Sequence, residues 1–238
     1  MASVGFNAPL GLSGQVDARI YKYFSLGAGI GYFPSTNIYP AMKYALGYFF
    51  PVPSSIGLNS QNPAYTPEAS IRSLKYGSLS YELLFNFYPY AGPVYFGFGL
   101  GYNETTIEAN TNITFTGDTS SFPAEIQSEI AGSKPIPVDI VAKFTRTYLS
   151  PHIGIFAPET FGSPFQSLRL GTEIGAMIMW TNSQKITRNS GSAEQEAFLE
   201  SQGLSNQISS ALESKAGVVG NAKVIPYWNV IRVGIELP

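Results

Sequence analysis

Apolar residues alternate with small or polar residues along most of this chain, with a period of two. In residues 94–102, for example, bulky apolar side chains occupy the even positions, and glycines occupy 97, 99 and 101. A period of two is typical of β-strands whose two faces meet different surroundings. The pattern predicts eight strands, at residues 3–7, 12–21, 26–33, 79–88, 94–102, 147–156, 168–180 and 228–237.

The connections between these strands alternate in length, which is the arrangement of an up-and-down barrel. Short turns lie near 22–23, 89–93 and 157–164, and a short link covers 8–11; long connections cover about 34–70, 111–140 and 183–222. We therefore expect an all-β fold, with residues 1–238 as one domain. It is an eight-stranded antiparallel up-and-down barrel with both termini on the side of the short turns.

One proline interrupts the strand predicted at 147–156. Pro151 cannot donate a hydrogen bond to a neighbouring strand. We therefore expect a β-bulge or the end of a strand at this position.

The size of the side chains indicates which face of the strands points outward. One face carries bulky residues such as Phe85, Phe98 and Trp180, and the other is rich in Gly and Ser. An eight-stranded lumen is only just wide enough for side chains to fill, so the bulky face must point outward, toward lipid. The composition agrees, because charged residues make up 13% of the chain, about half the usual share. The pattern favours a transmembrane β-barrel over a soluble lipocalin-like barrel or sandwich.

Charged residues in the predicted strands fall on the face of small residues, which becomes the lumen. A buried charge needs a partner because its desolvation is costly. Three basic and four acidic groups nearly balance, which favours an interior network of salt bridges. The alternative is a polar pathway gated by Glu and Arg. The members of this lumenal charge network are Asp17, Arg19, Glu82, Arg169, Glu173, Arg232 and Glu236.

Other kinds of chemistry find little support in the sequence. The net charge of −2 provides no basic surface for nucleic acid, and the absence of Cys excludes thiolate metal sites. His152, the only histidine, lies two residues from Ser150, but no third group completes a nucleophile and base. No set of His and carboxylate residues suits a transition metal. We therefore expect no catalysis, no cofactor and no metal.

Three segments resemble a known group of membrane proteins. Residues 21–33 (YKYFSLGAGIGYF), 86–102 (NFYPYAGPVYFGFGLGY) and 228–237 (WNVIRVGIEL) are similar to strands of the small bacterial outer-membrane barrels of the OmpA/OmpX/OmpW-like group. The chain departs from that group at Leu237-Pro238, where a terminal aromatic residue is usual. The resemblance implies an integral outer-membrane protein with extracellular loops and periplasmic termini. It also implies contacts with outer-membrane lipids and with the outer-membrane assembly machinery.

The long connections contain helix signals and form the expected extracellular cap. Ser192-Ala193-Glu194-Gln195 fits a capping box, Gly203 predicts a break between two helices, and Phe122-Pro123 leads into a helix over 124–130. The apolar residues of these helices either pack together over the barrel mouth or bind an extracellular ligand or protein. The candidate binding residues are loop aromatics that we expect to be exposed: Tyr39, Tyr44, Tyr48, Phe49, Phe50 and Phe198.

The expected function is therefore the presentation of a structured loop cap for a ligand or partner protein, without catalysis. A narrow channel for small or hydrophobic solutes is the alternative that the OmpW-like resemblance suggests. A lipid A-modifying barrel enzyme is a second alternative.

Overall fold

The computed structural model describes residues 2–8, 11–40, 55–59, 64–90, 92–130, 134–158, 168–208, 210 and 223–235. Two helices are labelled, α2 (Ala124–Ile130) and α3 (Ala193–Ser201). The strands are β1 (Ala2–Ala8), β2 (Gly11–Tyr21), β3 (Phe24–Asn37), β4 (Ser55–Gly57), β5 (Tyr65–Phe87), β6 (Val94–Gly117), β7 (Ile136–Pro158), β8 (Leu168–Ser190) and β9 (Val224–Ile235).

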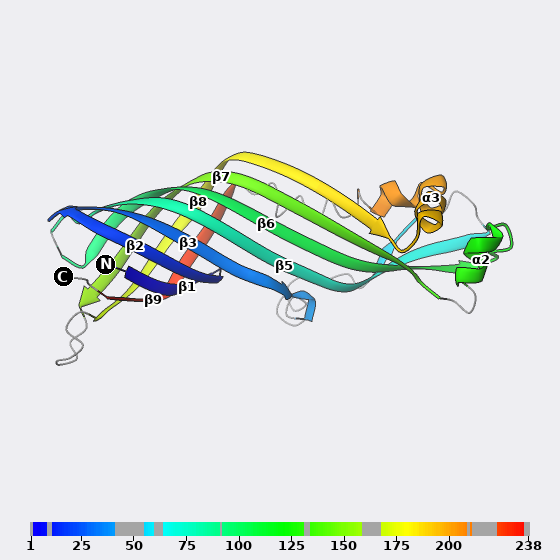
Figure 1. Cartoon of the computed structure of the whole chain (residues 1–238), viewed down its shortest axis with the longest axis horizontal. Helices are drawn as coiled ribbons and strands as arrows, with labels where there is room; N and C mark the ends of the chain where they lie inside the picture. Colours follow the sequence, from blue (N-terminus) through cyan, green and yellow to red (C-terminus); the bar gives the residue numbers. More distant parts are fainter. Residues whose placement is uncertain are drawn as a thin grey trace.

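Eight of the described strands close into an antiparallel ring, which confirms the predicted eight-stranded barrel. The order β3-β2-β1-β9-β8-β7-β6-β5 is closed by pairing between β3 and β5. The short strand β4 lies outside the ring, on the edge of β5. Ala2 pairs with Ile235, so the first and last described residues are adjacent at the end that carries the short turns (Figure 1).

The outer surface of the barrel is apolar, as the size of the side chains predicted. At the end opposite the short turns this band is bordered by the exposed aromatics Tyr32, Tyr81, Tyr102 and Trp180. Such a surface is stable only against lipid. Its exposed members between the aromatic borders include Val4, Leu12, Val16, Leu26, Ile30, Leu83, Phe96, Phe98, Leu100, Ile153, Ile155, Leu170, Ile174, Ile178, Ile231 and Val233.

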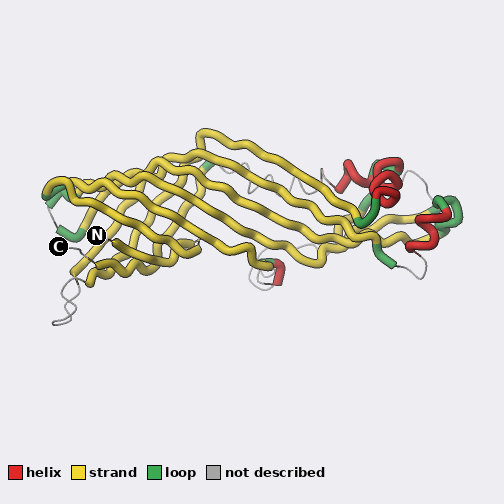
Figure 2. Tube along the Cα trace, viewed as in Figure 1, coloured by secondary structure: helices red, strands yellow, loops and turns green. Residues whose placement is uncertain are grey.

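The predicted lengths of the long loops are wrong, because much of each predicted loop is β-strand. β5, β7 and β8 have 23 residues each and β6 has 24, about twice the 9–11 residues that cross a bilayer. Figure 2 shows these four strands running on from the barrel to the helices at the far end of the molecule. In residues 105–117 the even positions carry Thr, Asn and Glu, whereas the odd positions include Ile107, Ile113 and Phe115. The alternation of period two therefore continues into the segment predicted to be a loop, with its polar face outward. Ladder hydrogen bonds to neighbouring strands hold these residues extended.

The far ends of these strands form a second hydrophobic core outside the barrel. We call this part the head; it comprises the described residues of 55–71, 111–140 and 186–210. Its core contains Leu58, Tyr65, Ala69, Ile113, Phe122, Ile126, Ile130, Ile136, Val138, Ile140, Phe198, Leu199, Leu204 and Ile208. The helices therefore pack on the extended strands, and not as a cap directly over the barrel mouth.

The helix boundaries follow the signals in the sequence. α2 covers 124–130 as expected. Ser192 caps α3 by accepting a hydrogen bond from the Gln195 N–H at 3.2 Å. Gly203 has φ of +67°, a left-handed conformation that ends α3 before a second helical segment at 204–208. The predicted break between two helices is therefore confirmed.

The expected bulge or strand end at Pro151 is wrong. Pro151 pairs with Phe98 on β6 without a register shift, and on the β8 side the register before and after Pro151 is the same. The bulge lies nearby, between Thr147 and Tyr148. Neither Ser150 nor Pro151 is paired with a residue of β8. The missing N–H of Pro151 is therefore tolerated at this position.

None of the helices in the described ranges is long and apolar enough to cross a membrane.

Candidate functional site

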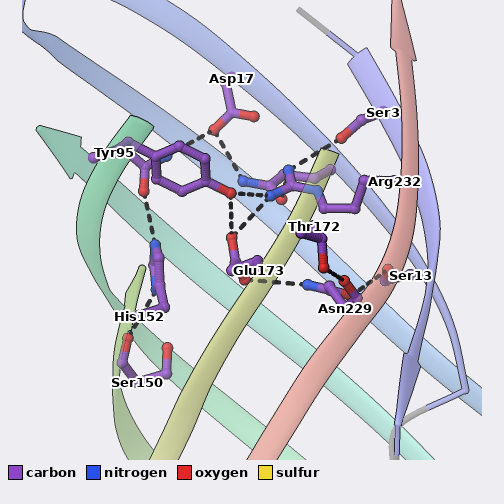
Figure 3. A network of polar contacts seen from close by, with 12 residues as sticks. Ser3, Ser13, Asp17, Tyr95, Ser150, His152, Thr172, Glu173, Asn229 and Arg232 are labelled. Carbon is purple, nitrogen blue, oxygen red and sulfur yellow. Dashed lines mark hydrogen bonds and ion pairs between the residues drawn. The ribbon is translucent and has the colours of Figure 1, made fainter. Parts of the chain in front are cut away.

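The centre of the lumen is a buried ion pair between Arg232 on β9 and Glu173 on β8 (Figure 3). Arg232 Nη1 lies 2.8 Å from Glu173 Oε2. The Tyr95 hydroxyl donates to the same oxygen at 2.6 Å, while Tyr227 OH and Asn229 Nδ2 donate to Oε1 at 3.2 and 3.1 Å. These donors come from β6 and β9, so one carboxylate joins three strands across the lumen.

A chain of polar contacts extends this pair toward β2 and β3. Arg232 Nη2 donates to Gln15 Oε1, and Gln15 Nε2 donates to Asp17 Oδ1 at 3.0 Å. Asn86 also donates to Asp17 Oδ1, at 3.5 Å, and to Ser25 Oγ at 3.3 Å. Asp17 is therefore linked to the Arg232 guanidinium by hydrogen bonds through the side-chain amide of Gln15.

Ser150 and His152 do not form a nucleophile and base. Ser150 Oγ donates to Glu82 Oε1, whereas His152 Nδ1 faces the Ser150 backbone carbonyl at 3.0 Å. His152 Nε2 lies 2.8 Å from Asn86 Oδ1. The histidine is thus occupied in the lumenal network, and its ring does not contact the hydroxyl that it would have to activate.

The remaining residues of the expected charge network lie elsewhere. Arg19 is exposed, with its guanidinium carbon 4.4 Å from the centroid of the Tyr88 ring. Arg169 is half-buried on β8, opposite Gly234. Glu236 lies outside the described residues. The network that the structure assembles consists of Asp17, Glu173 and Arg232, with Glu82 beside it.

Aromatic side chains fill much of the lumen, and the sequence reasoning did not single them out. Tyr95, Tyr148, Tyr227 and Phe156 are buried there. The signal was clearest at Tyr95, which is the one bulky residue on a strand face that continues with Gly97, Gly99 and Gly101.

The glycine columns accommodate these side chains. An added Cβ at Gly101 would overlap the Tyr148 ring, and one at Gly99 would overlap the Glu82 carboxylate. The glycines are therefore not the wall of an open passage. A cavity of about 40 Å³ lies between Glu82, Glu173 and Tyr227, which is room for a few water molecules.

Of the six candidate binding aromatics, Tyr39 and Phe198 lie within the described residues. Phe198 is only 5% exposed and belongs to the head core, so its expected exposure is wrong; the apolar face of α3 packs on Phe115 and Phe122. Tyr39 is half-buried beyond the end of β3. Tyr44, Tyr48, Phe49 and Phe50 lie outside the described residues.

An ion cluster fastens α3 to β8 in the head. Arg188 Nη2 lies 3.0 Å from Glu196 Oε1 and 3.0 Å from Glu200 Oε1, and Ser190 Oγ donates to Glu196 Oε2 at 3.0 Å. The hydrogen bonds from Arg188 and Ser190 hold the pKa of Glu196 below its ordinary value of 4.5. Among the described residues, no group of three His, Asp or Glu side chains gathers into a metal site.

No protein-family model and no curated protein matches this sequence. Two solved structures of Acinetobacter baumannii proteins are similar. CarO has 13% identity and a TM-score of 0.44, and CarO2 has 12% identity and a TM-score of 0.46. Each alignment covers 99% of this chain and 96% of the other. At this level of similarity, the assignment rests on the chain's own geometry: a closed ring of strands with an apolar outer band is an outer-membrane β-barrel.

Proposed function

We propose that this chain is a closed outer-membrane anchor that presents a folded head outside the cell for a ligand or partner protein, without catalysis. The observation that carries the proposal is the continuity of the strands. The β6–β7 ladder runs without a register shift from Val94–Ile155 in the barrel to Ile113–Ile136 in the head core. A rigid scaffold of this kind holds a binding surface at a fixed position.

The filled lumen supports anchoring rather than transport. Tyr95, Tyr148 and Tyr227 occupy the space between the strands, and the buried charges of Arg232 and Glu173 are paired. The same proposal places the head outside the cell and the termini in the periplasm. It also includes membership of the OmpA/OmpX/OmpW-like group.

The orientation is tested by labelling single cysteines, because the chain has no native Cys. Glu125→Cys lies on α2 in the head and Lys22→Cys lies in a short turn; both native side chains are exposed. A membrane-impermeant maleimide should label Glu125→Cys on intact cells, and Lys22→Cys only after permeabilisation. The reverse pattern would refute the proposal.

The binding role is tested on cells that display the full chain. Their attachment to a glycan array and to purified secreted proteins is compared with that of a variant in which a Gly-Ser turn replaces residues 118–135. We expect attachment by the full chain only, with heat-modifiable gel migration retained by both. Equal attachment of both would exclude α2 and its flanking loops as the binding element.

A narrow channel is the second candidate, because polar side chains line the lumen from Asp17 to Asn103. Planar-bilayer recording separates the two functions. A closed anchor gives no conductance steps, whereas Tyr148→Ala combined with Tyr227→Ala should produce small ones. Steps from the unmodified protein would favour the channel.

A further inference from the structure

The register of β5–β8 arranges their outward side chains into rows that cross four strands. The row at the aromatic border of the lipid band is Tyr81–Tyr102–Thr147–Thr181, and the next row is Leu79–Glu104–Thr145–Ser183. The third row is Gly77–Thr106–Lys143–Lys185.

Lys143 and Lys185 are directly opposite each other in this third row. Like charges in directly opposed positions of a sheet destabilise it. Both side chains are exposed, and within the described part of the chain neither forms an ion pair or a side-chain hydrogen bond. Within the described residues, therefore, no ion pair or hydrogen bond of either lysine side chain offsets this repulsion.

The neighbouring charges on the same face are partly engaged. In the fourth row Glu108 pairs with Lys75 at 3.4 Å, and in the fifth Asp139 accepts a hydrogen bond from Asn110 at 2.6 Å. Glu104, in the second row, is half-buried and has no ion pair among the described residues. The second and third rows together therefore carry an excess of one positive charge, concentrated on β7 and β8.

The height of the lysines above the lipid band indicates which anion they meet. Lys185 lies four residues beyond Thr181, about 13 Å along the strand and roughly 10 Å along the membrane normal at the usual tilt. The interfacial layer of a phospholipid leaflet is only about 5–8 Å deep, so its phosphates lie nearer the aromatic border. A phosphorylated sugar headgroup extends further from the hydrocarbon and reaches the lysine row.

We propose that Lys143 and Lys185 form a binding site for the phosphate groups of a glycolipid headgroup, of the kind that lipopolysaccharide carries. The hydroxyls of Thr145 and Ser183, between the lysines and the aromatic border, are placed to donate hydrogen bonds to the same headgroup. The anion offsets the repulsion between the two ammonium groups and fixes the height at which the barrel sits in the leaflet.

The test compares Lys143→Gln/Lys185→Gln with a control of equal charge change, Lys22→Gln/Lys134→Gln. Lys22 lies in a short turn and Lys134 in the head, and both are exposed. Each protein is refolded in neutral detergent, and its heat-modifiable transition is followed while purified lipopolysaccharide is titrated.

Without lipopolysaccharide, the Lys143/Lys185 variant should unfold at the same temperature as the unmodified protein or slightly higher, because a repulsion has been removed. With lipopolysaccharide, its apparent affinity should fall at least tenfold, whereas the control stays within twofold. Dephosphorylated lipopolysaccharide and phosphatidylglycerol should each bind the unmodified protein at least tenfold more weakly. Equal affinity of the two lysine variants, or equal affinity for either of these lipids, would overturn the proposal. This outcome is independent of what the head binds, because no head ligand is present.

Discussion

Arg232 Nη1 and Glu173 Oε2 lie 2.8 Å apart in the lumen, and both side chains are at most 5% exposed. Glu173 accepts hydrogen bonds from four side chains, including Tyr95 and Asn229. A buried ion pair is stable only when such additional hydrogen bonds offset the desolvation of both charges. Arg232 Nη2 also donates to Ser3 Oγ on β1 at 3.2 Å. The first and last strands of the ring, β1 and β9, are therefore joined by a side-chain contact inside the lumen as well as by their ladder.

Removal of one partner of this pair should destabilise the barrel strongly. We expect Arg232→Met to lower the free energy of unfolding by about 3–5 kcal/mol, because it leaves the Glu173 carboxylate buried without its cation. Urea unfolding in detergent micelles, followed by the fluorescence of Trp180 and Trp228, measures the change. Arg19→Gln is the control: Arg19 is exposed, and its contact with the Tyr88 ring should contribute no more than about 1 kcal/mol. Equal losses in the two variants would show that the ion pair has no special role.

The glycine columns should not tolerate side chains. Gly101→Val places its side chain on the Tyr148 ring, and overpacking of this kind costs about 1–3 kcal/mol. Gly14→Ala is the matched control, because its Cβ meets only Ile30 Cγ2, at an ordinary 3.6 Å. Replacing this strand glycine should be neutral or stabilising by up to about 1 kcal/mol. The same unfolding assay reports both, and Tyr148→Leu should partly rescue Gly101→Val but not change the behaviour of Gly14→Ala.

The head should unfold separately when its core is damaged. Phe198→Ala removes a ring that contacts Phe115 and Phe122 and should lower the local stability of the head by about 3–5 kcal/mol. Limited proteolysis should then cut within residues 183–210, while the barrel keeps its heat-modifiable migration. Ala197→Ser, on the exposed side of α3, should leave the cleavage pattern unchanged. Loss of barrel migration in Phe198→Ala would mean that the head and the barrel fold as one unit.

The contact between α3 and β8 should weaken in acid. The pKa of Glu196 is lowered in the folded head by hydrogen bonds from Arg188 and Ser190. Its contribution is therefore complete above the ordinary value of 4.5 and is lost as the pH falls through the lower folded pKa. A spin label at Glu194→Cys should report constant mobility between pH 7 and pH 5, and rising mobility below about pH 4.5. In Glu196→Gln the label should be more mobile at neutral pH, with a smaller acid response; an unchanged acid response would assign it to another group.

Much of the barrel could be predicted from local pattern alone. The period of two located the eight strands, and the size of residues such as Phe98 and Trp180 identified the face toward lipid. The helix signals at Ser192 and Gly203 were also sufficient, because capping depends on residues only a few positions apart.

Tertiary structure decided what local pattern does not encode. Residues 105–117 and 136–146 alternate apolar and mainly polar positions, but local pattern does not show that they continue the strands of the barrel. Pairing with neighbouring strands decides this, and it also extends residues 181–190, which lack such an alternation. The partner of Glu173 is Arg232 rather than Arg19, because the stagger of the strands sets which lumenal side chains lie at one level. The burial of Phe198 also depends on tertiary structure. The apolar stripe of its helix predicts that the helix packs against another surface, but that surface is assembled from segments distant in sequence.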